Sequence, residues 1–111
     1  MAEKRYLFIC AINQNRSITA EHICNQLAKA TNKDIECESA GINRTAVKRV
    51  TRKMADRADI IFVMEDNMKE TLMTEFHQSA EKIICLDIPD KYYVQDAELE
   101  ATIRQKLLQY I

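Results

Sequence analysis

Cys10 and Arg16 are the residues whose types and spacing most clearly point to chemistry. They stand six residues apart in the run Cys-Ala-Ile-Asn-Gln-Asn-Arg-Ser, between an apolar stretch and a helical pattern. A thiolate is a nucleophile, and a guanidinium presents paired N–H donors that fit two oxygens of a phosphate. A helix N-terminus adds free backbone N–H groups and a positive dipole end, which favour a bound anion and a thiolate alike. The spacing therefore predicts a nucleophile inside an anion-binding turn.

The elements on either side must position this turn. Residues 5–10 are apolar enough for a buried strand, and residues 17–30 carry apolar side chains at helical spacing. The pattern then predicts strands at 34–39, 59–64 and 82–87, and helices at 44–57, 65–76 and 95–110. Such alternation is typical of parallel strands joined by right-handed helical crossovers, with helices on both faces of the sheet. We expect an α/β three-layer sandwich forming a single domain over residues 1–111.

The loop between the first strand and the first helix contains no glycine. Backbone that wraps a phosphate often needs a positive φ, and asparagine tolerates that region best after glycine. Asn13 and Asn15 are the candidates; alternatively, their amides satisfy an ordinary surface turn. The residues predicted to bind phosphate are Ala11, Ile12, Asn13, Gln14, Asn15, Arg16 and Ser17.

A phosphate ester also needs an acid for its leaving group. Asp87 and Asp90 follow the last predicted strand, and ligands of open parallel sheets bind at the carboxyl ends of the strands. Tyr92 and Tyr93 come next and can wall a pocket with their rings. The alternatives are that Asp87 bonds local backbone and that one of the tyrosines belongs to the core.

Several segments together resemble the low-molecular-weight protein tyrosine phosphatase family. Cys10, Asn13, Arg16 and Ser17 match its signature of Cys, five residues, Arg and Ser after the first strand. The resemblance continues in Ser39-Ala40-Gly41, in Met64-Glu65 after the third strand, and in Asp90-Lys91-Tyr92-Tyr93, which is similar to the family's acid loop. The chain looks most like a shorter, bacterial-type branch.

The resemblance implies a four-stranded sheet in the order 2-1-3-4 and a phosphomonoester hydrolase that acts through a cysteinyl-phosphate, with protein tyrosine phosphatase activity. It implies no metal and no cofactor. The implied roles are attack by Cys10, oxygen binding by Arg16, loop support by Asn13, Ser17 and Ser39, general acid catalysis by Asp90 in preference to Asp87, and pocket walls from Tyr92 and Tyr93.

The chain departs from the family in ways that bear on its substrate. Ile12 stands where the family usually has glycine, and fewer residues follow Gly41 and Glu65 than is usual. The missing residues would wall an aryl pocket, so we expect an open, shallow site. The alternatives are a phosphatase of a nucleotide or RNA terminal phosphate, a thiol-dependent arsenate reductase, and a non-catalytic phosphate-binding module.

Composition limits the remaining possibilities. The chain has 111 residues, of which 47% are hydrophobic and 30% charged, and its formal net charge of −1 excludes a globally basic nucleic-acid binder. No run approaches the roughly 18 apolar residues of a membrane span, and we expect a cytoplasmic protein without a membrane partner. Its partner is expected to be a phosphorylated substrate; the oligomeric state stays open. Cys24, Cys37 and Cys85 are interpreted as small core residues in a reducing compartment.

Basic residues crowd the predicted helix 44–57. At helical spacing, Arg44, Lys48 and Arg52 would lie beside Arg49, Lys53 and Arg57 on one stripe. Such a stripe is either a solvated face or a landing surface for an anionic substrate.

Overall fold

The computed structural model describes residues 3–93 and 96–111. Four parallel strands form its sheet: β1 (Lys4–Cys10), β2 (Ile35–Gly41), β3 (Ile60–Val63) and β4 (Ile83–Cys85). Their spatial order is β2-β1-β3-β4, which confirms the predicted order 2-1-3-4. β1 lies between two neighbours and is buried from Tyr6 to Cys10, as its continuous apolar sequence requires.

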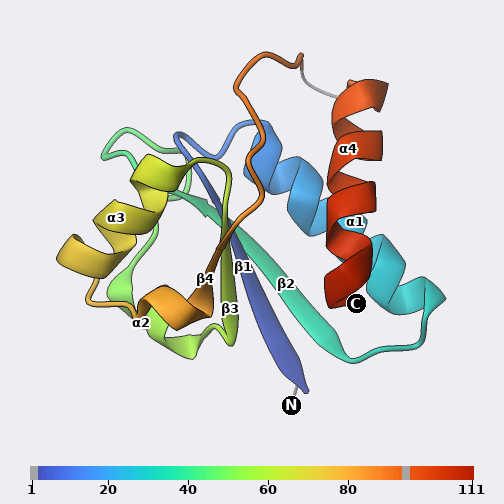
Figure 1. The fold of residues 1–111 in the computed structure, drawn as a ribbon, viewed down its shortest axis with the longest axis horizontal. Coiled ribbons are helices and arrows are strands. Elements are labelled where there is room, and N and C mark those ends of the chain that lie inside the picture. The colour runs from blue at the N-terminus through green and yellow to red at the C-terminus, as the bar shows by residue number, and fades with distance from the viewer. Residues whose placement is uncertain (1–2, 94–95) are drawn as a thin grey trace.

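Helices cover both faces of this sheet (Figure 1). On one face lie α1 (Arg16–Ala30) and α4 (Ala97–Leu107), which pack against each other, and on the other lie α2 (Arg52–Arg57) and α3 (Asp66–Glu75). Short 3-10 turns, η1 (Ala80–Lys82) and η2 (Leu108–Tyr110), precede β4 and follow α4. The three-layer α/β arrangement is thus confirmed, while the predicted helix start at residue 95 lies outside the described residues.

The centre of the sheet carries an aromatic cluster. The rings of Phe8 and Phe62 stack with centroids 5.0 Å apart, and Tyr6 meets Phe62 edge-on at 5.2 Å. Phe8 and Phe62 are wholly buried. This packing fixes β1 against β3, and so fixes the strand end from which Cys10 projects.

The prediction of one long helix over 44–57 is wrong, because only Arg52–Arg57 is helical. The segment 42–51 instead bonds through its backbone to its neighbours. Val47 N–H donates to Ile12 O at 3.0 Å, and Gly41 N–H donates to Lys48 O at 2.8 Å. Val50 N–H donates to Gly41 O at 2.9 Å. These bonds satisfy the backbone without a helix, so the predicted stripe of basic residues does not exist as a helical face.

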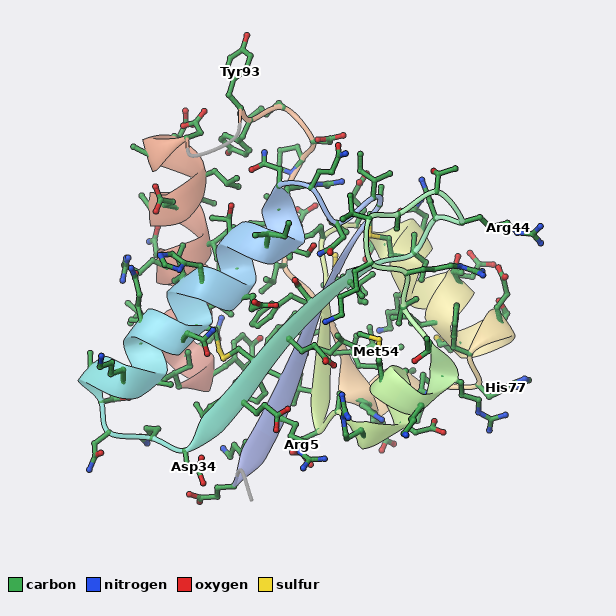
Figure 2. All side chains as sticks on the ribbon, turned by 180° about the vertical axis from the view of Figure 1, so that it is seen from behind. Arg5, Asp34, Arg44, Met54, His77 and Tyr93 are labelled. Atoms are coloured by element: carbon green, nitrogen blue, oxygen red, sulfur yellow. A yellow bond between two sulfur atoms is a disulfide. The ribbon has the colours of Figure 1, made fainter. Side chains whose placement is uncertain are left out.

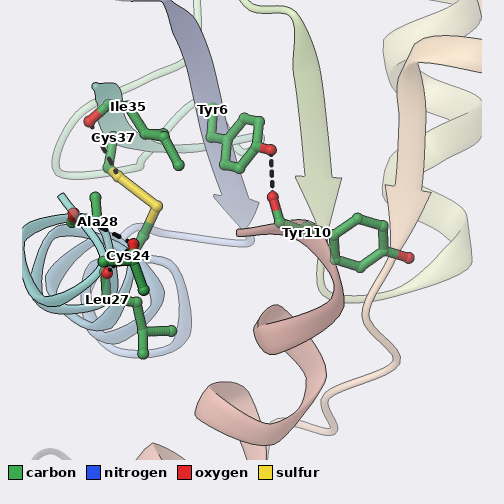
Figure 3. The surroundings of a disulfide bond; sticks show 8 residues. Tyr6, Cys24, Leu27, Ala28, Ile35, Cys37 and Tyr110 are labelled. Carbon is green, nitrogen blue, oxygen red and sulfur yellow. Dashed lines mark hydrogen bonds between the residues drawn. A yellow bond between two sulfur atoms is a disulfide. The ribbon is translucent and has the colours of Figure 1, made fainter. Parts of the chain in front are cut away.

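Cys24 and Cys37 form a disulfide that joins α1 to β2 (Figure 3). Their Cα atoms lie 6.3 Å apart, because α1 packs directly on β2. The interpretation of these two cysteines as unpaired core residues is therefore wrong, although Cys24 is fully buried. The expectation of a reducing compartment is therefore no longer supported by Cys24 and Cys37. Cys10 and Cys85 are the free cysteines among the described residues.

No helix within residues 3–93 and 96–111 combines the length and the apolar character that crossing a membrane requires.

Candidate functional site

The loop from Cys10 to Arg16 lies at the end of the sheet where β1 passes into α1. The segment after β4 crosses the same end (Figure 1), and Tyr93 and Arg44 both project there, opposite Arg5 and Asp34 (Figure 2). The carboxyl ends of all four parallel strands meet here, as expected for a ligand site in an open α/β sheet.

A buried network holds the loop from below. Asn13 Nδ2 donates to Ser17 Oγ at 2.8 Å and to Ser39 Oγ at 3.1 Å. All three side chains are buried. Asn13 has φ 57°, so it supplies the left-handed residue that a loop without glycine needs, in agreement with the sequence prediction. Through Ser39, the network ties the loop to the end of β2.

Two donors converge on the sulfur of Cys10. Asn13 N–H donates to Cys10 Sγ at 3.2 Å, and Ser17 Oγ lies 2.9 Å from the same atom. Because Ser17 Oγ already accepts a hydrogen bond from Asn13 Nδ2, its single hydroxyl hydrogen is available for the sulfur. These two contacts hold the sulfur at the base of the loop.

The side chain of Arg16 is only 3% exposed, and two hydrogen-bond acceptors hold its guanidinium group. Its Nη1 donates to Glu65 Oε2 at 2.8 Å and to Ile88 O at 2.7 Å. Ile88 is itself placed by its N–H, which donates to Met64 O at 2.9 Å. The ends of β3 and β4 thus fix the guanidinium. The sequence did not identify Glu65 as the partner of Arg16. The feature that could have indicated it was its position directly after the third strand.

The open side of the loop faces a hollow of about 270 Å³. Its lining residues are Cys10, Ala11, Ile12, Gln14, Asn15, Arg16, Asp90, Tyr92 and Tyr93. Most of the loop residues predicted to bind phosphate therefore line one pocket, whereas Asn13, Ser17 and Ser39 are buried beneath it. Tyr93 is 84% exposed and Tyr92 is half-buried, so the pocket is open to solvent on the side of the two tyrosines.

The structure separates the two candidate acids. Asp90 lines the pocket, and its Oδ1 lies 4.0 Å from Arg16 Nε. Asp87 is not among the lining residues; its backbone has φ 55°, and its carbonyl oxygen accepts from Lys106 Nζ at 3.2 Å. Asp87 thus sits outside the pocket, with its backbone held beside α4.

Asn15 connects the loop from Cys10 to Arg16 with the segment that carries Asp90. Its Nδ2 donates to Tyr92 O at 3.0 Å and lies 3.4 Å from Tyr93 O. Asn15 precedes α1 without capping it through its side chain, so the first turn of the helix keeps free N–H groups at the pocket. The sequence suggested Asn15 for phosphate binding and as a candidate for a positive φ, but its φ is −142°, and the sequence carried no signal for this link.

Comparison with known proteins agrees with this geometry. Residues 5–57 match the sequence model of a family described as low molecular weight phosphotyrosine protein phosphatase. No curated protein matches the chain. Among solved structures, a low molecular weight protein tyrosine phosphatase from T. tengcongensis is 23% identical with a TM-score of 0.80, over 98% of this chain and 100% of that one.

Two further structures are similar. The tyrosine phosphatase Wzb from Escherichia coli, in complex with phosphate, is 18% identical with a TM-score of 0.80, covering 96% of this chain and 95% of that one. The YwlE arginine phosphatase is 19% identical with a TM-score of 0.73, covering 95% and 94%. At such identities these likenesses show the shared fold.

The fold over nearly the whole chain and the sequence over residues 5–57 are similar to those of one class of protein, the low molecular weight phosphotyrosine protein phosphatases. Within that class, the family resemblance seen in the sequence is confirmed over residues 5–57, and the fold is confirmed over nearly the whole chain.

Proposed function

We propose that this protein hydrolyses phosphotyrosine through a cysteinyl-phosphate intermediate formed on Cys10, in a shallow and open site. The observation that carries the proposal is the single pocket onto which Cys10, Arg16 and Asp90 all open. A nucleophile, an oxyanion-binding cation and a carboxyl group on one cavity match the needs of phosphoryl transfer to a thiolate.

In the first step, the Cys10 thiolate attacks phosphorus, the Sγ–P bond forms and the ester P–O bond breaks. Asp90 gives its proton to the departing oxygen. Arg16 binds two equatorial oxygens through Nε and Nη2, because its Nη1 is already engaged by Glu65 and Ile88. In the second step, Asp90 takes a proton from water, which attacks phosphorus and releases the Cys10 thiolate.

The walls of the pocket favour an aryl substrate. Ile12, Tyr92 and Tyr93 offer apolar or aromatic surface beside the phosphate loop. With Tyr93 so exposed, the pocket encloses a ring on few sides, and we expect a high KM for small aryl phosphates. The phosphorylated active-site serine seen in a mutant of the YwlE arginine phosphatase supports a phosphoenzyme route for the shared fold.

Arsenate reduction finds less support. A thiol relay needs a second cysteine within reach of the nucleophile. Among the described residues that line the pocket, Cys10 is the only cysteine. Cys24 and Cys37 are joined to each other, and Cys85 lies on β4.

The test is hydrolysis of p-nitrophenyl phosphate by the wild type, Cys10→Ser and Cys85→Ser. Cys10→Ser should fold, bind vanadate and lose essentially all turnover, while Cys85→Ser serves as the matched control and stays active. Acid quenching of the wild type should trap phosphate on Cys10, detectable by mass spectrometry. Substantial turnover by Cys10→Ser would exclude the mechanism.

Substrate class is tested by comparing peptides that carry phosphotyrosine or phosphoarginine with an RNA that carries a terminal phosphate. The phosphotyrosine peptide should give the highest kcat/KM. A higher kcat/KM for the phosphoarginine peptide or the RNA would show that phosphotyrosine is not the preferred substrate. If the protein oxidised thiols in the presence of arsenate and hydrolysed none of these substrates, arsenate reduction would replace hydrolysis as the reaction.

A further inference from the structure

The basic residues between 44 and 57 are unequally engaged. Lys48 Nζ lies 3.6 Å from Glu38 Oε2, and Arg57 Nη2 lies 3.1 Å from Glu38 Oε1. Arg52 pairs with Asp56 at 3.6 Å. Within the part of the chain that the structure describes, Arg44 and Arg49 make no ion pair, and both are exposed. Their charges remain available for a ligand.

Arg44 and Arg49 face the same hollow, which has a volume of about 300 Å³. It lies between the segment 42–49 and α3. Its other lining residues are Ile42, Asn43, Asn67, Met68, Thr71 and Glu75. The buried side chain of Met68 lies among polar neighbours that can donate hydrogen bonds.

The linings of this hollow and of the catalytic pocket share no described residue, but backbone hydrogen bonds join the two. Asn43 N–H donates to Ala11 O at 3.0 Å, and Ile42 N–H donates to Cys10 O at 2.9 Å. Ala11 lines the catalytic pocket and Asn43 lines the second hollow, so the two hollows lie on neighbouring, hydrogen-bonded segments. Along α3, the lining runs from Asn67 to Glu75, a rise of about 12 Å and thus the length of about three or four extended residues.

We infer that this hollow, the Arg44/Arg49 groove, binds a carboxylate side chain of an acidic peptide whose phosphotyrosine occupies the catalytic pocket. The inference rests on the proposed function, which it extends to the residues that flank the phosphotyrosine. Two unpaired guanidinium groups are suited to a carboxylate, and Asn43, Asn67 and Thr71 can bond a peptide backbone.

The charges around the groove favour a peptide over a nucleic acid. Glu75 closes the far end of the lining. A phosphodiester chain carries a charge on every nucleotide and would be repelled there, whereas a peptide can place its carboxylate on the arginines and a neutral residue at Glu75. The net charge of −1 gives a nucleic acid no compensating attraction.

The test compares two phosphotyrosine peptides that differ only in flanking residues, one with Asp and Glu and the other with Asn and Gln. The wild type should favour the acidic peptide in kcat/KM by roughly 3–10-fold at low salt, and the preference should shrink as salt rises. Arg44→Gln/Arg49→Gln should lose the preference. Lys53→Gln removes an exposed charge outside the groove and should keep it.

A second measurement is independent of turnover. Titration of isotope-labelled protein with the acidic peptide lacking its phosphate should shift the backbone amide resonances of Asn43, Thr71 and Arg49. If both peptides were hydrolysed at equal rates and those resonances did not shift, the proposed function would remain intact, and the inference that the groove binds a carboxylate would be wrong. Larger shifts with a 5′-phosphorylated RNA would also overturn it. Failure to hydrolyse either peptide or any aryl phosphate would instead remove the proposed function, and the resonance shifts would then judge the groove separately.

Discussion

At the scale of single residues, Arg16 is a buried cation whose charge is balanced before any ligand arrives. Its guanidinium is 3% exposed and touches Glu65 at 2.8 Å. A buried charge that loses its partner is costly, whereas a half-exposed carboxylate such as Glu65 loses little on its own. The ion pair therefore stabilises the loop mainly because it compensates the buried charge of Arg16.

Glu65→Gln should make the stability of the protein depend on phosphate. Without ligand, the variant leaves Arg16 uncompensated and should lose about 1–2 kcal/mol. Saturating phosphate supplies the missing negative charge, so the deficit should narrow. Thermal unfolding with and without phosphate measures this, with Glu70→Gln, an exposed change on α3, as control. An equal deficit under both conditions would mean that Glu65 does not balance Arg16.

Asp90→Asn should slow hydrolysis far more than Asp87→Asn, because Asp90 lines the pocket and Asp87 does not. General acid catalysis contributes about 10² to 10⁴ in rate, and alkyl phosphates need it more than aryl phosphates. Asp87→Asn is the matched control, since asparagine tolerates the φ of 55° found there. The reverse order of effects would make Asp87 the acid.

At the scale of elements, the segment after β2 fits closely against the loop from Cys10 to Arg16. A Cβ added to Gly41 would lie 2.5 Å from Ala46 Cβ and 2.9 Å from both Ala11 O and Ile12 C. Two of these neighbours are backbone atoms of the loop and cannot move aside independently. Glycine is required here for close approach, and its φ is not positive.

Gly41→Ala should therefore disturb the loop as well as the fold. We expect a loss of about 1–3 kcal/mol in stability and a larger fall in kcat/KM than the stability loss alone explains. Denaturant unfolding and p-nitrophenyl phosphate hydrolysis measure the two effects. Adding Ala46→Gly removes one of the three contacts and should restore part of the stability. Normal activity in Gly41→Ala would show that the loop does not depend on this contact.

At the scale of the whole molecule, one hydrogen bond joins the beginning of the sheet to the end of the chain. Tyr6 OH donates to Tyr110 O across 104 residues (Figure 3). The ring of Tyr110 also meets Phe62 edge-on at 5.2 Å. Burial, with the nearby charge of Asp59 as a smaller cause, raises the pKa of Tyr6 above its ordinary value.

Tyr6→Phe should cost about 1 kcal/mol near neutral pH, because the Tyr110 carbonyl loses its donor. In the wild type, the unfolded chain ionises this tyrosine at a lower pH than the folded protein does. Stability should therefore fall as pH rises from about 10 towards the raised pKa of the folded state. Tyr6→Phe lacks that contribution, so the difference between the two proteins should narrow with pH. Urea unfolding at neutral and alkaline pH tests this, and a constant difference would contradict it.

The sequence by itself determined the features that depend on local patterns. The strand 5–10, the helix that follows it and the spacing of Cys10 and Arg16 across the turn are visible because apolar spacing and side-chain type are local properties. Residue type limited the positive φ of the loop to Asn13 or Asn15, and the structure places it at Asn13. The strand order followed from the family resemblance.

Only the tertiary structure decided the contacts between distant surfaces. The pairing of Arg16 with Glu65, the bond from Asn15 to Tyr92 and the disulfide of Cys24 with Cys37 depend on which elements pack together. The segment 42–51 shows the reason most clearly. Its residues are compatible with a helix, but their backbone groups find partners at Gly41 and Ile12, and those partners exist only once the sheet has formed.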